Sequence, residues 1–389
     1  MSSLMHSYNR LSFKPAYGKG AWVFDEQGNK CLDALGGIAV CALGHAHEAV
    51  SQAICDQSKR LMHTSNLYQV PAQEELGDKL CKVAQMDSAF ICNSGAEANE
   101  AAIKLARLYA SKRAIKNPQI VVMEGAFHGR TMATLTATGN RKIQAGFEPL
   151  VQGFLRAPYG DIEALKQIAS NSKDVVAVLL EPIQGEGGII VPPTDYLAKV
   201  REICDEHEWL MMLDEIQTGI GRTGAWFAWM HENARPDVLT SAKALGNGFP
   251  IGACLASGQA AELIQPGSHG TTFGGNPLAC TVANTVLDEI ISKDYVKRAG
   301  ELGKHIQKAL WSRLGTNPGV MTIRGKGLMI GIQLDRNCGA LMQQGIDNGI
   351  LINVTANKVI RLLPPYILTD DEAEQLIERV SRLVLDFLD

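Results

Sequence analysis

The fold is decided by residues 175–215, "VVAVLLEPIQGEGGIIVPPTDYLAKVREICDEHEWLMMLDE". Two apolar runs, "VVAVLLEP" (175–182) and "LMMLDE" (210–215), flank a stretch with helical character at 195–208. A strand that is apolar along its whole length is buried on both faces, which is typical of parallel sheets covered by helices. This stretch therefore predicts a strand–helix–strand unit of an α/β sheet.

The same alternation extends in both directions along the chain. Further strands are expected at 88–93, 119–124, 237–243 and 253–257, with helices at 96–116 and 161–170. A hairpin is expected near the start ("WVFD" and "KCLDAL"), and after about residue 275 the pattern changes to long helices at 277–292, 294–314 and 370–388 with the strands "ILINV" and "VIRLLPP". The sequence thus predicts a large α/β domain at 51–275 and a smaller α+β domain built from both ends, 1–50 and 276–389.

Composition excludes several classes of protein. The 389 residues carry a net charge of -4 with no basic tract, so we expect no nucleic-acid partner. No apolar run approaches the roughly 20 residues that span a bilayer, so we expect no membrane partner. The nine scattered cysteines form no CxxC pair, which is typical of reduced thiols and indicates a cytoplasmic protein.

Polar side chains or glycine follow five of the predicted strands directly. In open parallel sheets, ligands bind just beyond the carboxyl ends of the strands, so these groups are expected to share one edge and to form a site. They are Asn93-Ser94-Gly95, Glu124 to His128, Glu181, Asp214-Glu215 and Lys243.

Three of these positions allow two interpretations each. Ser94 and Gly95 stand where a helix begins, and its unpaired N–H groups can bind a phosphate; the alternative is a plain N-cap by Asn93 or Ser94. The buried Asp214 requires a cationic partner, either an arginine from elsewhere or a protonated ring nitrogen of a cofactor. Lys243 is either a solvated strand end or a desolvated amine that forms a Schiff base with an aldehyde.

One cofactor satisfies the second interpretation at all three positions. Pyridoxal 5′-phosphate requires a lysine for its aldehyde, an acid for its pyridine nitrogen and a cradle for its phosphate. The sequence therefore predicts pyridoxal 5′-phosphate bound covalently to Lys243.

Seven motifs resemble, in order and spacing, the class III pyridoxal phosphate-dependent aminotransferases, and the resemblance covers nearly the whole chain. They are "NSGAEANEAAIK", "GAFHGRT", "EPIQGEGG", "LDEIQTGIGRTG", "SAKALGNGFPIGA", "TTFGGNPLAC" and "IRLLPP". The resemblance implies fold type I, in which a large, mostly parallel seven-stranded sheet has helices on both faces. It also implies a homodimer with shared active sites that acts on amino-acid and 2-oxo-acid substrates.

The resemblance also implies roles for individual residues around the cofactor. Lys243 resembles the lysine that binds the cofactor and moves the substrate proton, and Asp214 resembles the partner of the ring nitrogen. Gln217 resembles the residue that bonds the ring hydroxyl, and Phe127, with His128 beside it, the aromatic residue that stacks on the ring. The phosphate contacts implied are Ser94, Gly95, Ala96 and, from the other subunit, Thr272.

Within the class, the motifs are most similar to those of the acetylornithine aminotransferases. This implies transfer of the δ-amino group of N2-acetylornithine to 2-oxoglutarate, with Arg130 and Thr271 as contacts for the donor. Arg361 resembles the arginine that clamps the carboxylate next to the reacting carbon of glutamate. We expect Glu181 to pair with Arg361 while the donor is bound and to release it for the second half-reaction; the alternative for Glu181 is a solvated strand end.

Other functions stay open at this point. Succinylornithine, N-succinyl-diaminopimelate, ornithine and 4-aminobutyrate are alternative donors, and a non-catalytic binding protein with this cofactor fold is the alternative of a different class. "GIGRTG" (219–224) matches a dinucleotide motif, but no alanine-rich helix follows it. His45 and His47 have no third ligand at a suitable spacing, so we expect no metal.

Overall fold

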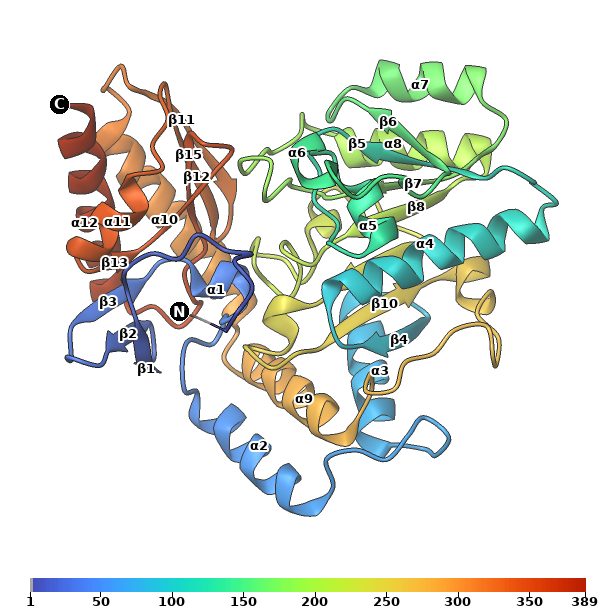
Figure 1. Cartoon of the computed structure of the whole chain (residues 1–389), viewed down its shortest axis with the longest axis horizontal. Helices are drawn as coiled ribbons and strands as arrows, with labels where there is room; N and C mark the ends of the chain where they lie inside the picture. The colour runs from blue at the N-terminus through green and yellow to red at the C-terminus, as the bar shows by residue number, and fades with distance from the viewer. Residues whose placement is uncertain (1–2) are drawn as a thin grey trace.

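The computed structural model describes residues 3–389 and contains a seven-stranded sheet, which lies in the right half of Figure 1. Its strand order is β4-β10-β9-β8-β7-β5-β6. The strands are β4 (Ser88–Cys92), β5 (Gln119–Met123), β6 (Phe154–Ala157), β7 (Val175–Leu180), β8 (Leu210–Asp214), β9 (Val238–Ser241) and β10 (Gly252–Ala256). Six of these strands were predicted, and β6 was missed.

The predicted mostly parallel arrangement is confirmed. Strands β5 to β9 pair in parallel, whereas β10 runs antiparallel to both β4 and β9. Because β10 is antiparallel to both of its neighbours, β4 and β9 run in the same direction. The carboxyl end of β4 therefore lies at the same edge as those of the parallel strands.

Helices cover both faces of this sheet. Ile120, Val122 and Leu179 point toward α4 (Gly95–Lys112), whose alanine-rich face packs on the sheet. Val121 and Val178 are sequence neighbours of these residues and point to the other face. There they belong to the larger hydrophobic cluster, beneath α7 (Ile162–Asn171) and α8 (Tyr196–His207). Side chains of a strand alternate between faces, so strands that are apolar throughout require both layers.

Both ends of the chain build the remaining layers. The hairpin of β2 (Trp22–Asp25) and β3 (Lys30–Asp33) joins β1 (Pro15–Lys19) and, in parallel, β13 (Ile350–Leu351). A second sheet has the order β11-β12-β15-β14, with β11 (Val320–Lys326), β12 (Met329–Leu334), β14 (Asn353–Thr355) and β15 (Val359–Leu362). Neither sheet fixes where one domain ends, so the boundaries at 50 and 275 stay a prediction.

The remaining helices complete the fold shown in Figure 1. They are α1 (Gly36–Ala39), α2 (Glu48–Arg60), α3 (Pro71–Ala84), α5 (Met132–Ala137), α6 (Arg141–Gln144), α9 (Pro277–Ser292), α10 (Tyr295–Leu314), α11 (Leu341–Asp347) and α12 (Asp370–Leu388), with short 3-10 turns η1 (Ala228–His231), η2 (Lys243–Leu245) and η3 (Gly258–Glu262). Helix α9 packs against α2 and α3, and α12 against α10. Across residues 3–389, every helix is too short or too polar to cross a bilayer.

The "GIGRTG" stretch is structural. Its Arg222 is fully buried and stacks on the ring of Tyr366, with its guanidinium carbon 4.6 Å from the ring centre. The guanidinium donates to the carbonyl oxygens of Leu328 and Pro364, so it ties the large sheet to the C-terminal layer. His45 binds Asp33 at 2.8 Å, and no cluster of metal-binding side chains occurs among residues 3–389.

Candidate active site

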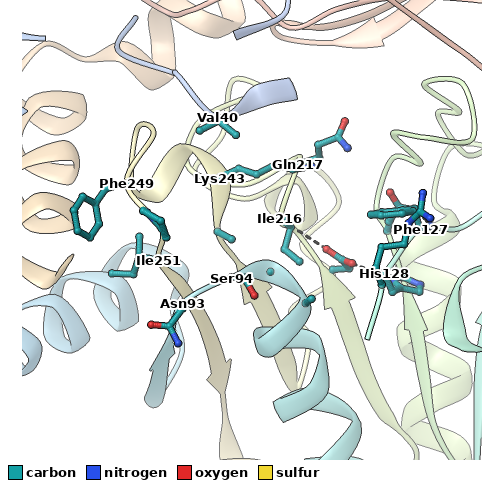
Figure 2. A pocket seen from close by; sticks show the side chains of 18 of the residues that line it. Val40, Asn93, Ser94, Phe127, His128, Ile216, Gln217, Lys243, Phe249 and Ile251 are labelled. Carbon is teal, nitrogen blue, oxygen red and sulfur yellow. Dashed lines mark hydrogen bonds and ion pairs between the residues drawn. The ribbon is translucent and has the colours of Figure 1, made fainter. Parts of the chain in front are cut away.

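A cavity of about 450 Å³ opens at the carboxyl edge of the large sheet. All five predicted strand ends contribute to its wall, and Figure 2 shows Lys243, Gln217, Phe127 and Ser94 arranged around it. The lining residues from these strand ends are Asn93, Ser94, Gly95, Ala96, Phe127, His128, Gly129, Arg130, Glu181, Asp214, Ile216, Gln217, Ala242 and Lys243. Val40 and the segment 248–251 complete the wall, whereas Glu124 and Glu215 do not line it.

Lys243 stands two residues after the end of β9 and has a left-handed backbone, φ +47°. L-residues rarely adopt this conformation, and where they do the site is often functional. Burial, followed by the positive charge of Arg361, lowers the pKa of Lys243 to about 8. A substantial fraction of this lysine is therefore a neutral, nucleophilic amine near pH 8.

Asp214 is buried at the end of β8 and is held by three hydrogen bonds. Its Oδ2 accepts from Nδ1 of His128 and from Nδ2 of Asn99, each at 2.8 Å, and its Oδ1 accepts from the backbone N–H of Ile216 at 3.1 Å. No Lys or Arg side chain within residues 3–389 forms an ion pair with it. The carboxylate is therefore free to pair with a protonated nitrogen in the pocket.

The N-cap interpretation of Ser94 is confirmed, whereas phosphate binding at this helix start stays a prediction. Ser94 is the N-cap of α4, since its Oγ accepts from the N–H of Glu97 at 3.2 Å. In the described part of the chain, the N–H groups of Gly95 and Ala96 have no hydrogen-bond acceptor, and both residues line the cavity. A Cβ atom on Gly95 would lie 2.6 Å from Cδ1 of Ile216, so glycine keeps this cradle open for an anion.

The segment that follows β5 supplies an aromatic wall. Phe127 donates its backbone N–H to Oε2 of Glu181 at 3.0 Å, which fixes the start of this segment. The guanidinium carbon of Arg130 lies 5.6 Å from the centre of the Phe127 ring. This geometry is suited to stacking a planar ring and presenting one cation beside it.

The predicted pair of Glu181 with Arg361 is not formed. Both carboxylate oxygens of Glu181 accept backbone N–H groups, from Phe127 and, at 3.1 Å, from Gly185, and burial raises its pKa to about 7. Arg361 pairs instead with Glu186, at 2.5 Å between Nη1 and Oε1. The reason is that Glu181 directly follows the buried strand β7, whereas Glu186 lies in the next turn, which contacts Thr355 of β14 and Arg361 of β15.

Arg361 is otherwise held by amides. Its Nη2 and Nε donate to Oδ1 of Asn353 at 2.7 and 3.1 Å, and its Nη1 also lies 3.3 Å from Oε1 of Gln217. The side chain of Arg361 is 1% exposed, whereas that of Glu186 is 36% exposed. Within the described residues, Arg361 is thus a fixed, buried cation with one acidic partner, Glu186, which reaches solvent.

Thr271 and Thr272 do not line the cavity of their own chain. Oγ1 of Thr271 accepts from Nδ2 of Asn93 at 3.2 Å, which places the loop beside the cavity wall. Thr272 is exposed. The contacts predicted for both threonines therefore stay predictions.

Three residues of the site were not singled out from the sequence: Asn99, Glu186 and Asn353. Asn99 stands one helical turn after Gly95 in an alanine-rich helix, where a buried amide is unusual. Glu186 lies in the quoted motif "EPIQGEGG", but the motif contains two glutamates and does not indicate which of them faces Arg361. Asn353 gives no signal in the sequence.

The cavity fits pyridoxal 5′-phosphate. Its free N–H groups are suited to bind a phosphate, and its lysine of lowered pKa is suited to condense with an aldehyde. Its buried carboxylate, which has no Lys or Arg partner among residues 3–389, is suited to bind a protonated pyridine nitrogen. The topology of the large sheet is that of fold type I, so the fold and the cavity together define a pyridoxal phosphate-dependent enzyme.

The chain belongs to the class III aminotransferases. The family model described as "Aminotransferase class-III" matches residues 5–384. The chain is 52% identical to the acetylornithine aminotransferase of Nitrosomonas europaea, over 100% of this chain and 99% of that protein, and 43% identical to that of Methanothermobacter thermautotrophicus, over 98% and 96%.

Solved structures show the same fold. The ornithine aminotransferase of Toxoplasma gondii superposes with a TM-score of 0.96 at 32% identity, covering 99% of this chain and 93% of that one. The N-acetylornithine aminotransferase of Stenotrophomonas maltophilia superposes with a TM-score of 0.86 at 35% identity, covering 98% of each.

Loading of the apoenzyme with cofactor should depend on the pKa of Lys243. Only the neutral amine attacks an aldehyde, so the rate of covalent loading should rise with pH and level off above about 8. A solvated lysine would give a rate that climbs toward about 10.4. Stopped-flow absorbance across this range measures the midpoint, and a midpoint near that of free lysine contradicts the lowered pKa.

Proposed function

We propose that this enzyme transfers the δ-amino group of N2-acetylornithine to 2-oxoglutarate. The observation that carries the proposal is the full-length identity of 43–52% to curated acetylornithine aminotransferases. The test is kcat/KM for acetylornithine, succinylornithine, free ornithine and 4-aminobutyrate, each with 2-oxoglutarate. A higher value for any donor other than acetylornithine would overturn the assignment.

The proposed roles follow from the contacts of each residue. When bound, the cofactor supplies an aldehyde that condenses with amines and a ring that withdraws electrons from the carbon next to nitrogen. Lys243, left as a free amine after the substrate amine takes its place, removes and returns the proton at that carbon. Asp214 holds a proton on the ring nitrogen, and Gly95 and Ala96 donate their N–H groups to the phosphate.

Arg361 and Glu186 explain how one pocket accepts two substrates. The donor carries no carboxylate next to its δ-amino group, so Glu186 stays on Arg361 and neutralises a buried cation. Glutamate and 2-oxoglutarate carry one there, and it binds the planar guanidinium through two parallel hydrogen bonds in place of Glu186. Because Glu186 is partly exposed, it can leave toward solvent. This proposal assigns to Glu186 the role that the sequence suggested for Glu181.

Glu186→Gln should separate the two half-reactions. Arg361 then lacks its negative partner while the donor is bound, so single-turnover kcat/KM for acetylornithine should fall roughly 10- to 100-fold. The value for glutamate should stay within about 3-fold, because its own carboxylate replaces the lost charge. Stopped-flow absorbance of the bound cofactor measures each half-reaction separately.

Glu181→Gln is the matched comparison. Glu181 orients the backbone of Phe127 and Gly185, which both half-reactions use, so it should slow them to a similar extent. A selective loss of the donor half-reaction in Glu181→Gln, with none in Glu186→Gln, would restore the original assignment of Glu181.

We also propose a homodimer in which Thr272 of one copy binds the phosphate in the other. Exposed apolar side chains gather next to the loop that carries Thr272: Leu67, Tyr68 and Phe273 are 87%, 67% and 63% exposed. Asn66 joins these segments through a hydrogen bond to the carbonyl of Gly274 at 3.0 Å. Sedimentation velocity should give a dimer, and a monomer that binds the cofactor with full affinity would contradict the proposal.

The cytoplasm is the proposed location. All nine cysteines are free in the structure, which is in keeping with a reducing compartment. Fractionation of cells that express the protein at native level tests this, and recovery with the membrane or secreted fraction would refute it.

A further inference from the structure

The side chain of Asn99 lies behind Asp214 and has no role in the function proposed above. It stands in α4 with no exposed surface, between the buried residues Ala98 and Ala101. An asparagine disfavours a helix interior relative to alanine, and a buried amide is costly unless its groups are hydrogen-bonded. Its presence in this helix therefore has to be explained by its partners.

Asn99 binds three elements of the site at once. Its Nδ2 donates to Oδ2 of Asp214 and to the backbone carbonyl of His128, each at 2.8 Å. Its Oδ1 accepts from the hydroxyl of Thr240 at 2.8 Å. A carboxylate and a carbonyl only accept, so the NH₂ group must face them and the orientation of the amide is determined.

These bonds make the two oxygens of Asp214 unequal. Among residues 3–389, Oδ2 is occupied by two side-chain donors, Asn99 and His128, whereas Oδ1 receives only the N–H of Ile216 at 3.1 Å. Asp214, His128 and Ile216 all line the cavity, and Figure 2 shows His128 and Ile216 on its wall. Oδ1 is therefore the oxygen with unused acceptor capacity.

We infer that Asn99 is a positioning residue. It holds Asp214 through Oδ2 and leaves Oδ1 to bind the protonated ring nitrogen of the cofactor. Through Thr240 on β9, it also connects this carboxylate to the strand that ends next to Lys243. The inference rests on the proposed role of Asp214.

Asn99→Asp is the sharpest test, because it keeps the shape but places an oxygen against Oδ2 of Asp214. The dissociation constant of pyridoxal 5′-phosphate should rise roughly 10- to 100-fold, the effect of losing a hydrogen bond to a charged group. The pH midpoint of the absorbance change of the bound cofactor should move by about one pH unit or more. The value of kcat should fall, whereas the KM for the donor should change less, because Asn99 does not touch the donor.

Asn284→Asp is the matched control. Asn284 is also a buried helical asparagine, in α9, and its Nδ2 donates to the carbonyl of Ala72 at 2.9 Å, outside the cavity. This variant should lower the Tm but keep the cofactor affinity and the pH midpoint. Wild-type values in Asn99→Asp, or equal shifts in both variants, would overturn the inference.

Two further variants keep the test decisive if Asn99→Asp fails to fold. Asn99→Ala removes the donor without adding a charge and should weaken cofactor binding and shift the midpoint. Thr240→Val leaves Asn99 in place but frees its Oδ1, and should give a smaller shift in the same direction. Unchanged cofactor affinity and midpoint in both would also overturn the inference.

Asp214→Asn distinguishes a failure of this inference from a failure of the proposed role of Asp214, on which the inference rests. If that variant leaves the affinity and the spectrum of the bound cofactor unchanged, the role of Asp214 is wrong and that of Asn99 fails with it. If Asp214→Asn changes both while the Asn99 variants change neither, only the inference about Asn99 fails.

Discussion

Replacing Lys243 by alanine should abolish covalent cofactor binding and lower kcat by at least roughly 10³-fold. The variant loses both the amine that condenses with the aldehyde and the base that moves the substrate proton, and general acid–base catalysis alone contributes up to about 10⁴-fold. Borohydride reduction followed by peptide mass analysis should label Lys243 in the native holoenzyme and no residue in the variant.

Lys173→Ala is the control for this experiment. Lys173 is exposed and precedes β7, at the opposite edge of the sheet from the cavity. Its substitution should leave both labelling and turnover unchanged. Labelling of any residue other than Lys243 in the native enzyme would remove the basis of the proposed site.

Asp214→Asn should give the second-largest loss, roughly 10²- to 10³-fold in kcat. The substitution keeps the size of the side chain, but a neutral amide cannot stabilise the positive charge on the ring nitrogen, and such preorganised electrostatic contacts contribute about this much. The absorbance of the bound cofactor should change with it. Steady-state kinetics and a pH titration of the spectrum measure both effects.

The adjacent buried carboxylate supplies a matched control. Glu215 accepts from the hydroxyl of Thr218 and from the backbone N–H groups of Ala228 and Trp229, and burial raises its pKa to about 7. It does not line the cavity. Glu215→Gln should therefore lower the Tm while the cofactor spectrum stays as in the wild type. Equal spectral changes in both variants would show that Asp214 has no special contact with the ring.

Most of the fold could be predicted because it depends on local periodicity. The strand β7 is apolar throughout and is followed by Glu181, and β8 is apolar up to its last residue, Asp214, so the sequence indicates both their burial and their functional edge. β6 was missed because "FLRA" has only four residues and includes an arginine. The antiparallel direction of β10 was also not predictable, because a buried strand is apolar throughout whether it runs parallel or antiparallel to its neighbours.

The sequence by itself determined which residues gather at the edge of the sheet, because parallel strands bring their carboxyl ends together whatever their order. Only the tertiary structure decided which of these residues contact each other. Glu186 and Arg361 are 175 positions apart, and Asn99 and Asp214 are 115 apart, so no local pattern links them. Glu181 and Glu186 are the same residue type in one motif, and the direction in which the chain turns after β7 decides which one reaches the arginine.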